Sequence, residues 1–274
     1  MVEGAKGTAS DVYLLGTGDA AAERLRLLDK VYGPSTRTML RDAGLREGMR
    51  VLDLASGIGA VSCWLATQVG PTGSVIAADV NPDQLVVAKW HCAKCEHLPI
   101  DYIEASAYET GFPAESFDLV HIRLLLCHLT DPARVLREVY RILKPGGVLV
   151  CQDIKVSSVF CSPESPVFTR ANAAAAELGK ALGVDYDYGV RLPADAVDAG
   201  FSSVEVRLTQ PAYLRGPEKR LWEISLAEAA PVILRSGVSS VEELESVLAE
   251  MRRLAEDERV LIAQWCLPGV IAVK

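Results

Sequence analysis

The sequence contains no block rich in lysine and arginine. Its 274 residues include 28 Lys plus Arg against 36 Asp plus Glu, which gives a formal net charge of −8. Nucleic acids and anionic membrane surfaces attract basic patches, and much of their binding energy comes from those charges. The charge balance therefore argues against nucleic acid or a membrane surface as the main partner.

Long apolar segments are also missing. Residues 1–12 contain no apolar h-region, so we expect no secretory signal. The longest apolar tract, Val260 to Val273, is interrupted by Gln264 and Pro268 and falls short of a bilayer span. The seven cysteines are scattered and odd in number, which does not indicate a disulfide framework. These absences predict a cytoplasmic protein.

The chain has enough apolar residues for a full core. Half of its residues are hydrophobic and the mean hydropathy is +0.19. From Arg50 to Gln152, short β-rich runs alternate with helical patterns, as in βαβ units around a parallel sheet. The expected strands are Arg50–Leu54, Ser74–Ala78, Ile100–Glu104, Phe117–Ile122 and Val148–Gln152. The expected helices between them are Gly59–Val69, Asn81–Glu96 and Ala133–Leu143.

The flanks of this alternation have a different character. Before it, Ala20–Tyr32 and Ser35–Ala43 have helical spacing. After it, we expect helices at Pro166–Gly183, Pro193–Ala199 and Pro217–Asp257, a strand at Val204–Thr209 and a final strand pair within Leu261–Val273. We divide the chain into an N-terminal helical cap (1–47), a ligand-binding core (48–155), and the rest of the sheet with a helical lid (156–274).

The loop after the first strand is built to hold a ligand close to its backbone. A dinucleotide fingerprint fits poorly, because Ser62 stands where the third glycine after Gly57 and Gly59 is needed. A Walker-type phosphate loop fails, because no Gly-Lys-Ser/Thr follows. Asp53 at the mouth of the loop would repel a pyrophosphate but attract the cationic end of S-adenosylmethionine.

The stretch Asp53-Leu54-Ala55-Ser56-Gly57-Ile58-Gly59 resembles motif I, D-x-G-x-G-x-G, of the class I S-adenosylmethionine-dependent methyltransferases. Ala55 departs from the first glycine of that motif. Further matches follow in order: Asp79 ends the second strand, and "SFDLVHIRLLLCHLTDP" and "LREVYRILKPGGVLV" resemble the small-molecule branch that includes quinone and natural-product enzymes. The family's aspartate after the third strand is replaced here by Ala105-Ser106-Ala107.

The resemblance implies a doubly wound, Rossmann-like, seven-stranded and mostly parallel sheet with helices on both faces and a helical substrate cap. It implies S-adenosylmethionine as cofactor, with Asp79 taking the ribose hydroxyls. The implied cofactor site consists of Tyr13, Asp53, Ala55, Gly57, Gly59, Asp79, Val80, Gln84, Ser106, Ala107 and Arg123.

Three polar side chains near the fourth strand have competing interpretations. We expect His128 to contact or deprotonate the acceptor, since histidine suits general base catalysis; otherwise it is a packing residue. His121 lies within the strand and is expected to be a satisfied core residue. Arg123 pairs either with the cofactor's carboxylate or with Asp118 or Asp131.

The segment "WHCAKCEH" places His91, Cys92, Cys95 and His97 together. A structural zinc site normally recruits a second ligand pair, and no second C-x-x-C exists, so we expect no metal. Arsenite-methylating relatives also use several cysteines, which keeps thiol-mediated metalloid methylation as a minor alternative.

The sequence therefore predicts a methyltransferase for the oxygen, nitrogen or carbon of a small, largely apolar acceptor. A protein that keeps the cofactor but catalyses a pericyclic step, or regulates, is the alternative, and a nicotinamide reductase is a third. A homodimer is possible. The aromatic residues available to line an acceptor pocket, each equally suited to the core, are Tyr186, Tyr188, Tyr213, Trp222 and Trp265.

Overall fold

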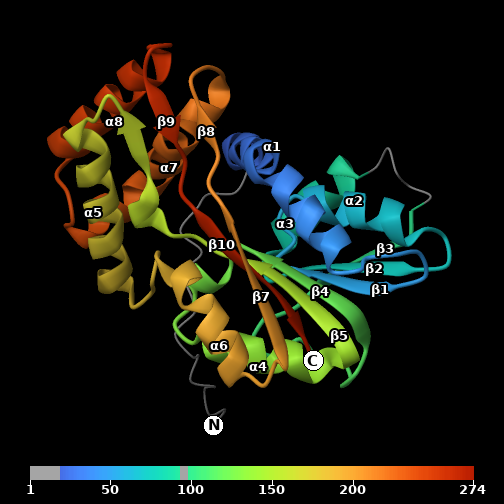
Figure 1. The fold of residues 1–274 in the computed structure, drawn as a ribbon. Coiled ribbons are helices and arrows are strands. Elements are labelled where there is room, and N and C mark those ends of the chain that lie inside the picture. Colours follow the sequence, from blue (N-terminus) through green and yellow to red (C-terminus); the bar gives the residue numbers. More distant parts are fainter. Residues whose placement is uncertain (1–18, 93–97) are drawn as a thin grey trace, which may run out of the picture.

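The computed structural model describes residues 19–92 and 98–274, and its centre is a seven-stranded sheet (Figure 1). The strands are β1 (Arg50–Leu54), β2 (Ser74–Asp79), β3 (Ile100–Glu104), β4 (Phe117–Arg123), β5 (Leu143–Gln152), β7 (Ser203–Thr209) and β10 (Leu267–Val273). Their order is β3-β2-β1-β4-β5-β10-β7, with β10 antiparallel to both neighbours. This confirms the predicted mostly parallel α/β sheet.

Helices cover both faces of the sheet. On one face lie α1 (Asp19–Asp42), α2 (Ala60–Val69) and α3 (Pro82–His91), and on the other lie α4 (Pro132–Ile142) and α6 (Leu192–Asp198) (Figure 1). The helices begin where local chemistry favours it. At α4, Asp131 accepts a hydrogen bond from the Arg134 backbone N–H, and Pro132 occupies the first turn, where its missing N–H costs nothing.

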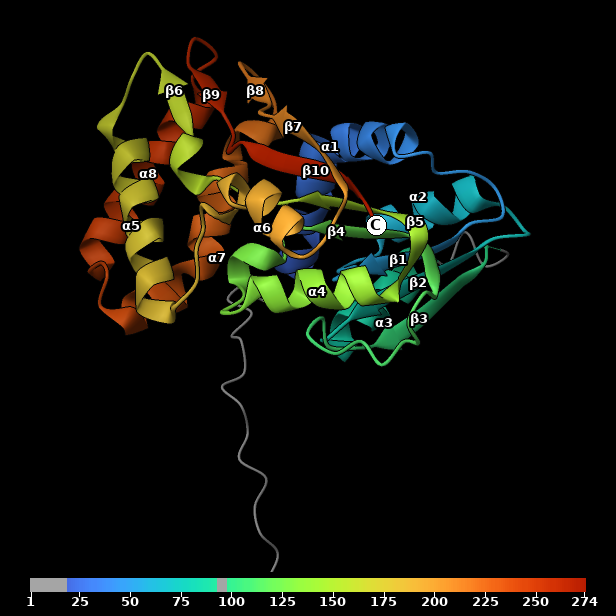
Figure 2. The same cartoon turned by 60° about the horizontal axis from the view of Figure 1, so that its bottom comes forward.

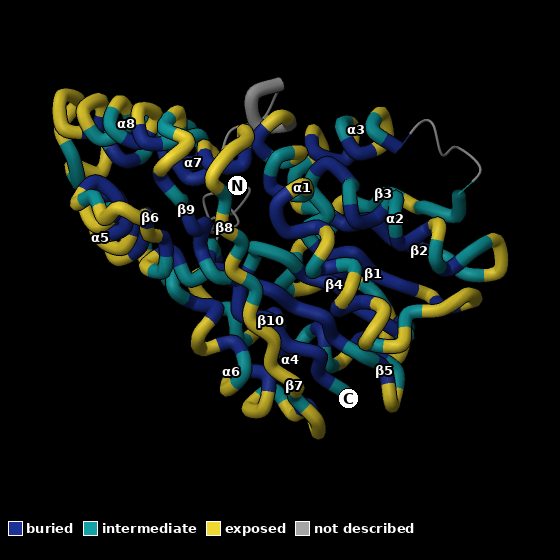
Figure 3. The backbone as a smooth tube through the Cα atoms, turned by 45° about the horizontal axis from the view of Figure 1, so that its top comes forward, coloured by how far each residue is buried: buried dark blue, intermediate teal, exposed yellow. Residues whose placement is uncertain are grey.

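The alternation of side chains along β1 explains the two-sided packing. Val51 belongs to the buried cluster that contains α1 and α2 residues, whereas Leu52 and Leu54 belong to the cluster that contains α4 residues. Successive strand residues point to opposite faces, so a strand covered on both sides must be apolar throughout. Figure 3 shows the central strands as the most deeply buried part of the backbone. Among the buried residues of β1, Asp53 is the polar exception.

A second layer of helices lies beyond one edge of the sheet (Figure 2). It contains α5 (Pro166–Leu182), α7 (Leu221–Ser236) and α8 (Val241–Glu256), with a small sheet of β6 (Phe160–Ser162), β9 (Leu261–Ala263) and β8 (Ala212–Tyr213). We call these elements the cap. Short 3-10 turns lie in the connections of the chain. They are η2 (Leu126–His128) between β4 and α4, η3 (Val156–Ser158) between β5 and β6, η4 (Tyr188–Val190) between α5 and α6, and η5 (Pro217–Arg220) between β8 and α7.

Several predicted boundaries are wrong. The two N-terminal helices are one helix, α1, which continues through Pro34, and Ser35 and Thr36 hydroxyls bond back to the Tyr32 carbonyl there. The region 217–257 is divided, because Gly237 ends α7 in the left-handed conformation. The final strand pair is not a pair: β9 joins the small sheet, while β10 inserts between β5 and β7.

The described residues contain one disulfide, which the cysteine count did not indicate. Cys63 of α2 and Cys92, which follows α3, are bonded, with 5.9 Å between their Cα atoms. Cys127, Cys151, Cys161 and Cys266 are free. A single bond is not the framework of a disulfide-rich domain, but it ties together the two helices that flank the glycine loop. Within the described residues, no helix is long and apolar enough to cross a membrane.

Candidate active site

One cavity of about 550 Å³ lies at the carboxyl ends of the parallel strands. Its lining includes the segments that follow β1, β2 and β4, together with side chains of α1, α5 and α7. Strand β1 has β2 on one side and β4 on the other, so the chain reverses direction across the sheet at this point. Ligands of open α/β sheets bind at such switch points.

The glycine loop forms one end of this cavity. Ala55 adopts a left-handed conformation with φ 60°, and Gly57 follows with φ 52°. Both line the cavity, and a Cβ added to Gly57 would meet only Leu25, at 3.9 Å. The backbone at Gly57 is therefore open to close approach by a ligand.

Gly59 ends the loop and packs against α3. It precedes α2 with φ 72° and is absent from the lining of the cavity. A Cβ at this position would lie 3.0 Å from the Cβ of Ala88 on α3. Its small size therefore lets α2 and α3 pack closely behind the loop.

Asp79 organises the two loops that meet at the end of β2. One carboxylate oxygen accepts the Gly57 backbone N–H at 3.0 Å, and the other accepts the Asn81 N–H at 3.0 Å. Burial raises the pKa of Asp79, against these two bonds, which lower it. Each oxygen keeps a further lone pair, so the carboxylate can still accept from a vicinal diol.

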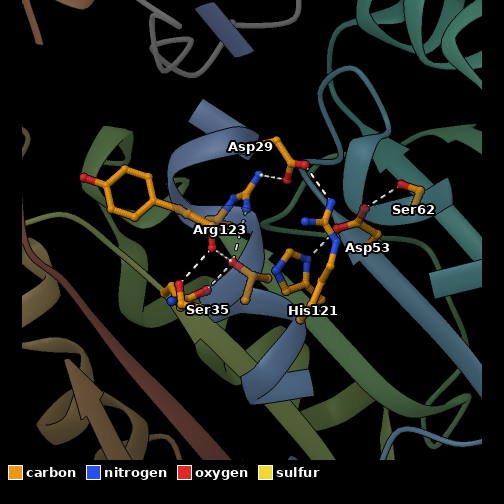
Figure 4. Close-up of polar contacts among 10 residues, drawn as sticks. Asp29, Ser35, Asp53, Ser62, His121 and Arg123 are labelled. Atoms are coloured by element: carbon orange, nitrogen blue, oxygen red, sulfur yellow. Dashed lines mark hydrogen bonds and ion pairs between the residues drawn. The ribbon is translucent and has the colours of Figure 1, made fainter. Parts of the chain in front are cut away.

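Asp53 lines the cavity, and two side chains hold its carboxylate. His121 Nδ1 lies 2.7 Å from one carboxylate oxygen, and the Ser62 hydroxyl donates to the other (Figure 4). Asp53 and His121 are register partners on β1 and β4, which brings their side chains together. His121 lines the cavity, and its Nε2 atom is buried with no hydrogen-bond partner in the described residues. The expected satisfied core histidine is thus satisfied on one nitrogen only.

Arg123 ends β4 and contacts α1 (Figure 4). Its guanidinium donates to Asp29 at 3.2 Å and to the Thr36 hydroxyl at 3.2 Å. Neither Asp118 nor Asp131, the partners considered from the sequence, is involved in these bonds. Arg123 also lines the cavity, so it joins α1 to the ligand edge of the sheet.

The other predicted cofactor residues fall into two groups. The cavity lining includes Val80, which is exposed, Gln84, which is buried, and the pair Ser106 and Ala107 after β3. The Ser106 hydroxyl accepts the Tyr108 N–H at 3.3 Å. Tyr13 lies outside the described residues.

His128 lines the cavity from η2. Burial, together with the positive charge of Arg24, lowers its pKa to about 4, so the ring is neutral near pH 7. The ring makes an edge contact with Tyr186, with 5.6 Å between the ring centroids.

Asp153, which the sequence interpretation missed, fixes the turn that carries His128. This buried residue follows β5, and its carboxylate accepts the backbone N–H groups of Leu126 at 2.8 Å and Cys127 at 3.2 Å. Burial raises its pKa to about 6. A carboxyl group directly after a strand that ends at the ligand edge was the available signal.

The cap contributes an aromatic and aliphatic surface, which we call the acceptor wall: Leu178, Tyr186, Trp222, Leu226, Ile233 and Trp265. Trp222 and Trp265 pack edge to face, with 5.5 Å between centroids. Two of the aromatic candidates belong elsewhere. Tyr188 is buried and donates to Asp195 at 2.9 Å, and Tyr213 is absent from the lining.

The cysteines do not converge on the cavity. Cys127 is the one cysteine of the described chain that lines it, and burial raises its thiol pKa, so it presents no thiolate. No group of three or more potential metal ligands occurs within residues 19–92 and 98–274. Cys95 and His97 of the sequence cluster lie outside the described residues.

This fold and this site resemble those of class I S-adenosylmethionine-dependent methyltransferase domains. Residues 52–151 match the family described as "Methyltransferase domain". That match covers the glycine loop, Asp79 and the strands up to β5.

Part of the chain is also similar in sequence to individual methyltransferases. The chain is 37% identical over 139 residues to the ubiquinone/menaquinone biosynthesis C-methyltransferase UbiE of Pseudoalteromonas translucida (strain TAC 125), covering 49% of this chain and 52% of that protein. It spans about half the length of the curated relatives it matches.

Two solved structures share the fold. A SAM dependent methyltransferase from Aquifex aeolicus has a TM-score of 0.53 and 18% identity, covering 94% of this chain and 99% of the other. The [4+2]-cyclase SpnF has a TM-score of 0.52 and 17% identity, covering 95% and 86%. The fold alone therefore does not fix the chemistry.

Proposed function

We propose that this protein transfers the methyl group of S-adenosylmethionine to a small, largely apolar acceptor. The observation that carries the proposal is a single cavity lined at one end by Gly57 and Asp79 and at the other by the acceptor wall. Methyl transfer needs the two reactants in one water-poor space with fixed orientation, and the protein contributes mainly positioning.

The residues at the loop end fit the cofactor. The Asp79 carboxylate has capacity for the ribose diol, and the open backbone at Gly57 allows close approach. The Ser56 hydroxyl is buried in the same lining with no partner in the described residues, so it is available to a ligand. When bound, the cofactor supplies a methyl carbon already activated by the sulfonium. Val80, Gln84, Ser106 and Ala107 complete this proposed half of the site.

The other half takes the acceptor. His128 is neutral and faces the same cavity as the acceptor wall, so we propose that it contacts the acceptor. Replacing His128 with alanine should lower the rate of methyl transfer while leaving cofactor binding unchanged. His91→Ala, a histidine outside the cavity, is the matched control. An unchanged rate in His128→Ala removes this role.

The decisive test is titration calorimetry with S-adenosylmethionine, S-adenosylhomocysteine and NADH. We expect micromolar binding of the first two, weakened at least about tenfold in Asp79→Asn through loss of a charged hydrogen-bond partner. Asp83→Asn removes a nearby exposed charge outside the cavity and should bind normally. Binding of NADH alone would overturn the proposal.

Turnover separates the remaining alternatives. Release of S-adenosylhomocysteine with an acceptor identifies a methyltransferase, whereas cofactor binding without release supports a pericyclic or regulatory role. Arsenite-dependent release would identify the metalloid alternative. A cytoplasmic location, a homodimer and the division at residues 47 and 155 stay predictions from the sequence.

A further inference from the structure

The acceptor end of the cavity contains one buried cation with spare hydrogen-bonding capacity. Arg24 of α1 is 3% exposed and lines the cavity. Its Nε atom donates to Glu228 of α7, while its Nη2 atom is buried with no hydrogen-bond partner in the described residues. Glu228 does not line the cavity, although one of its oxygens also has no partner there. A ligand in the cavity therefore meets the cationic member of the pair.

The surrounding side chains favour an oxygen acceptor over a cation. Within the described lining, the acidic residues are Asp53, Asp79 and Asp131. Asp53 and Asp79 lie at the carboxyl ends of β1 and β2, and the Asp131 backbone N–H donates to the hydroxyl of Tyr108, which follows Ser106 and Ala107 at the cofactor end. On the acceptor wall, the polar atoms that lack a partner in the described residues are the Tyr186 hydroxyl and the indole N–H groups of Trp222 and Trp265. A hydroxyl and two N–H groups can all donate, and an indole N–H can only donate.

His128 does not supply an efficient base for this oxygen. Burial and the positive charge of Arg24 hold its pKa at about 4. A group with so low a pKa is a poor proton acceptor near pH 7. An acceptor with an ionisable oxygen would instead enter as the anion, leaving its proton in the solvent.

We propose that the cavity selects a phenol or enol on an apolar ring and binds it as the anion, with the oxygen facing Arg24 and the ring against the acceptor wall. This deepens the proposed function and rests on it. Arg24 then determines specificity, because its charge distinguishes an oxyanion from a neutral ring or an ammonium group.

The test uses 4-nitrophenol, whose ionised form is coloured and whose neutral form is not. In the full chain with saturating S-adenosylhomocysteine, we expect the bound probe to titrate about one pKa unit below the free probe, which is about a tenfold preference for the anion. 4-Nitroanisole, which cannot ionise, should bind about tenfold more weakly than the phenolate.

Arg24→Met alone leaves Glu228 buried without its partner and is expected to fold poorly. The informative variant is therefore Arg24→Met/Glu228→Gln, in which the titration shift should disappear. Glu228→Gln alone keeps the cation and removes its competitor, so the shift should persist or grow. Tyramine, an ammonium-bearing phenol, should bind more weakly than 4-nitrophenol to the native protein.

Each outcome bears on the idea. A native protein that binds 4-nitrophenol in its neutral form, or binds neither probe while binding S-adenosylhomocysteine, overturns it. An equal shift in the native protein and in Arg24→Met/Glu228→Gln also overturns it. Failure of S-adenosylhomocysteine to bind is a separate result, since it removes the proposed function itself rather than the role of Arg24.

Discussion

At the scale of single residues, the backbone at Ala55 shows what the first glycine of the loop motif provides. Ala55 has φ 60°, a left-handed conformation that costs a residue with a Cβ about 1–2 kcal/mol. The motif identifies the loop, but the sequence alone does not show which residue of the loop adopts the left-handed conformation. Alanine in place of glycine at position 55 therefore strains the backbone locally, and the loop still makes its left-handed turn there.

Two opposite substitutions test this interpretation. Ala55→Gly relieves the strain but frees the unfolded chain, so we expect the free energy of unfolding to rise by between zero and about 1 kcal/mol. Gly59→Ala should lower it by more than about 1 kcal/mol, because φ is 72° and the new Cβ meets Ala88 at 3.0 Å. Urea unfolding measures both changes, and a Gly59→Ala protein as stable as the native one would contradict the account.

Single residues also mark the limit of what the sequence could predict. Asp53 and Asp79 were found because a motif and a strand end identify them. The partners of Asp53 and Arg123 could not be found from the sequence, because they depend on strand register and on the path of α1. Register pairs Asp53 with His121, and α1 brings Asp29 to Arg123 across 94 positions of the chain.

At the scale of elements, η2 is the short turn on which the acceptor site depends. Asp153 holds η2 through two backbone N–H groups, and His128 ends the turn. A three-residue turn has few hydrogen bonds of its own, so a buried carboxylate stabilises its geometry. Such an element has no periodicity that the sequence could reveal.

The two buried titratable groups around η2 should affect stability in opposite directions. Burial raises the pKa of Asp153 from 3.8 to about 6. Between these two pH values the folded state binds more protons than the unfolded state, so this group makes stability fall as pH rises. Burial lowers the pKa of His128 from 6.5 to about 4, so the unfolded state binds more protons and stability rises with pH. In the native protein the two contributions partly cancel.

Replacing one residue at a time separates the two slopes of unfolding free energy against pH. In urea unfolding between pH about 4 and about 6, His128→Gln should show stability that falls with pH, and Asp153→Asn should show stability that rises. The slope is the readout, because Asp153→Asn also loses hydrogen bonds at every pH. Identical slopes in both variants would show that these groups do not titrate as described.

At the scale of the whole molecule, the sequence predicted the sheet better than the cap. Residues 50–152 alternate between strand and helix patterns, and the shared edge of a parallel sheet then places the ligand. The cap helices α5, α7 and α8 show their apolar faces in the sequence, but not which partner covers each face. Strands as short as β6 and β8, of three and two residues, have no detectable pattern.

The packing nevertheless joins the cap and the sheet into one unit. A single buried cluster contains Leu52 and Ile122 of the sheet together with Phe168, Leu226 and Met251 of the cap. Arg24 and Glu228 link α1 to α7, and Arg123 links α1 to β4. Because the same apolar cluster stabilises both parts, neither is expected to keep its structure after the other unfolds.

We therefore predict one cooperative unfolding transition. In a Trp64→Phe/Trp90→Phe variant, tryptophan fluorescence reports on Trp222 and Trp265 beside the cavity. Its urea curve should coincide with that from far-ultraviolet circular dichroism, which reports on the whole fold. Saturation with S-adenosylhomocysteine at about 100 times its dissociation constant should move both curves together, by about 2.7 kcal/mol. If the fluorescence transition came first and the ligand moved only the second, the cap would be an independent domain resting on the sheet.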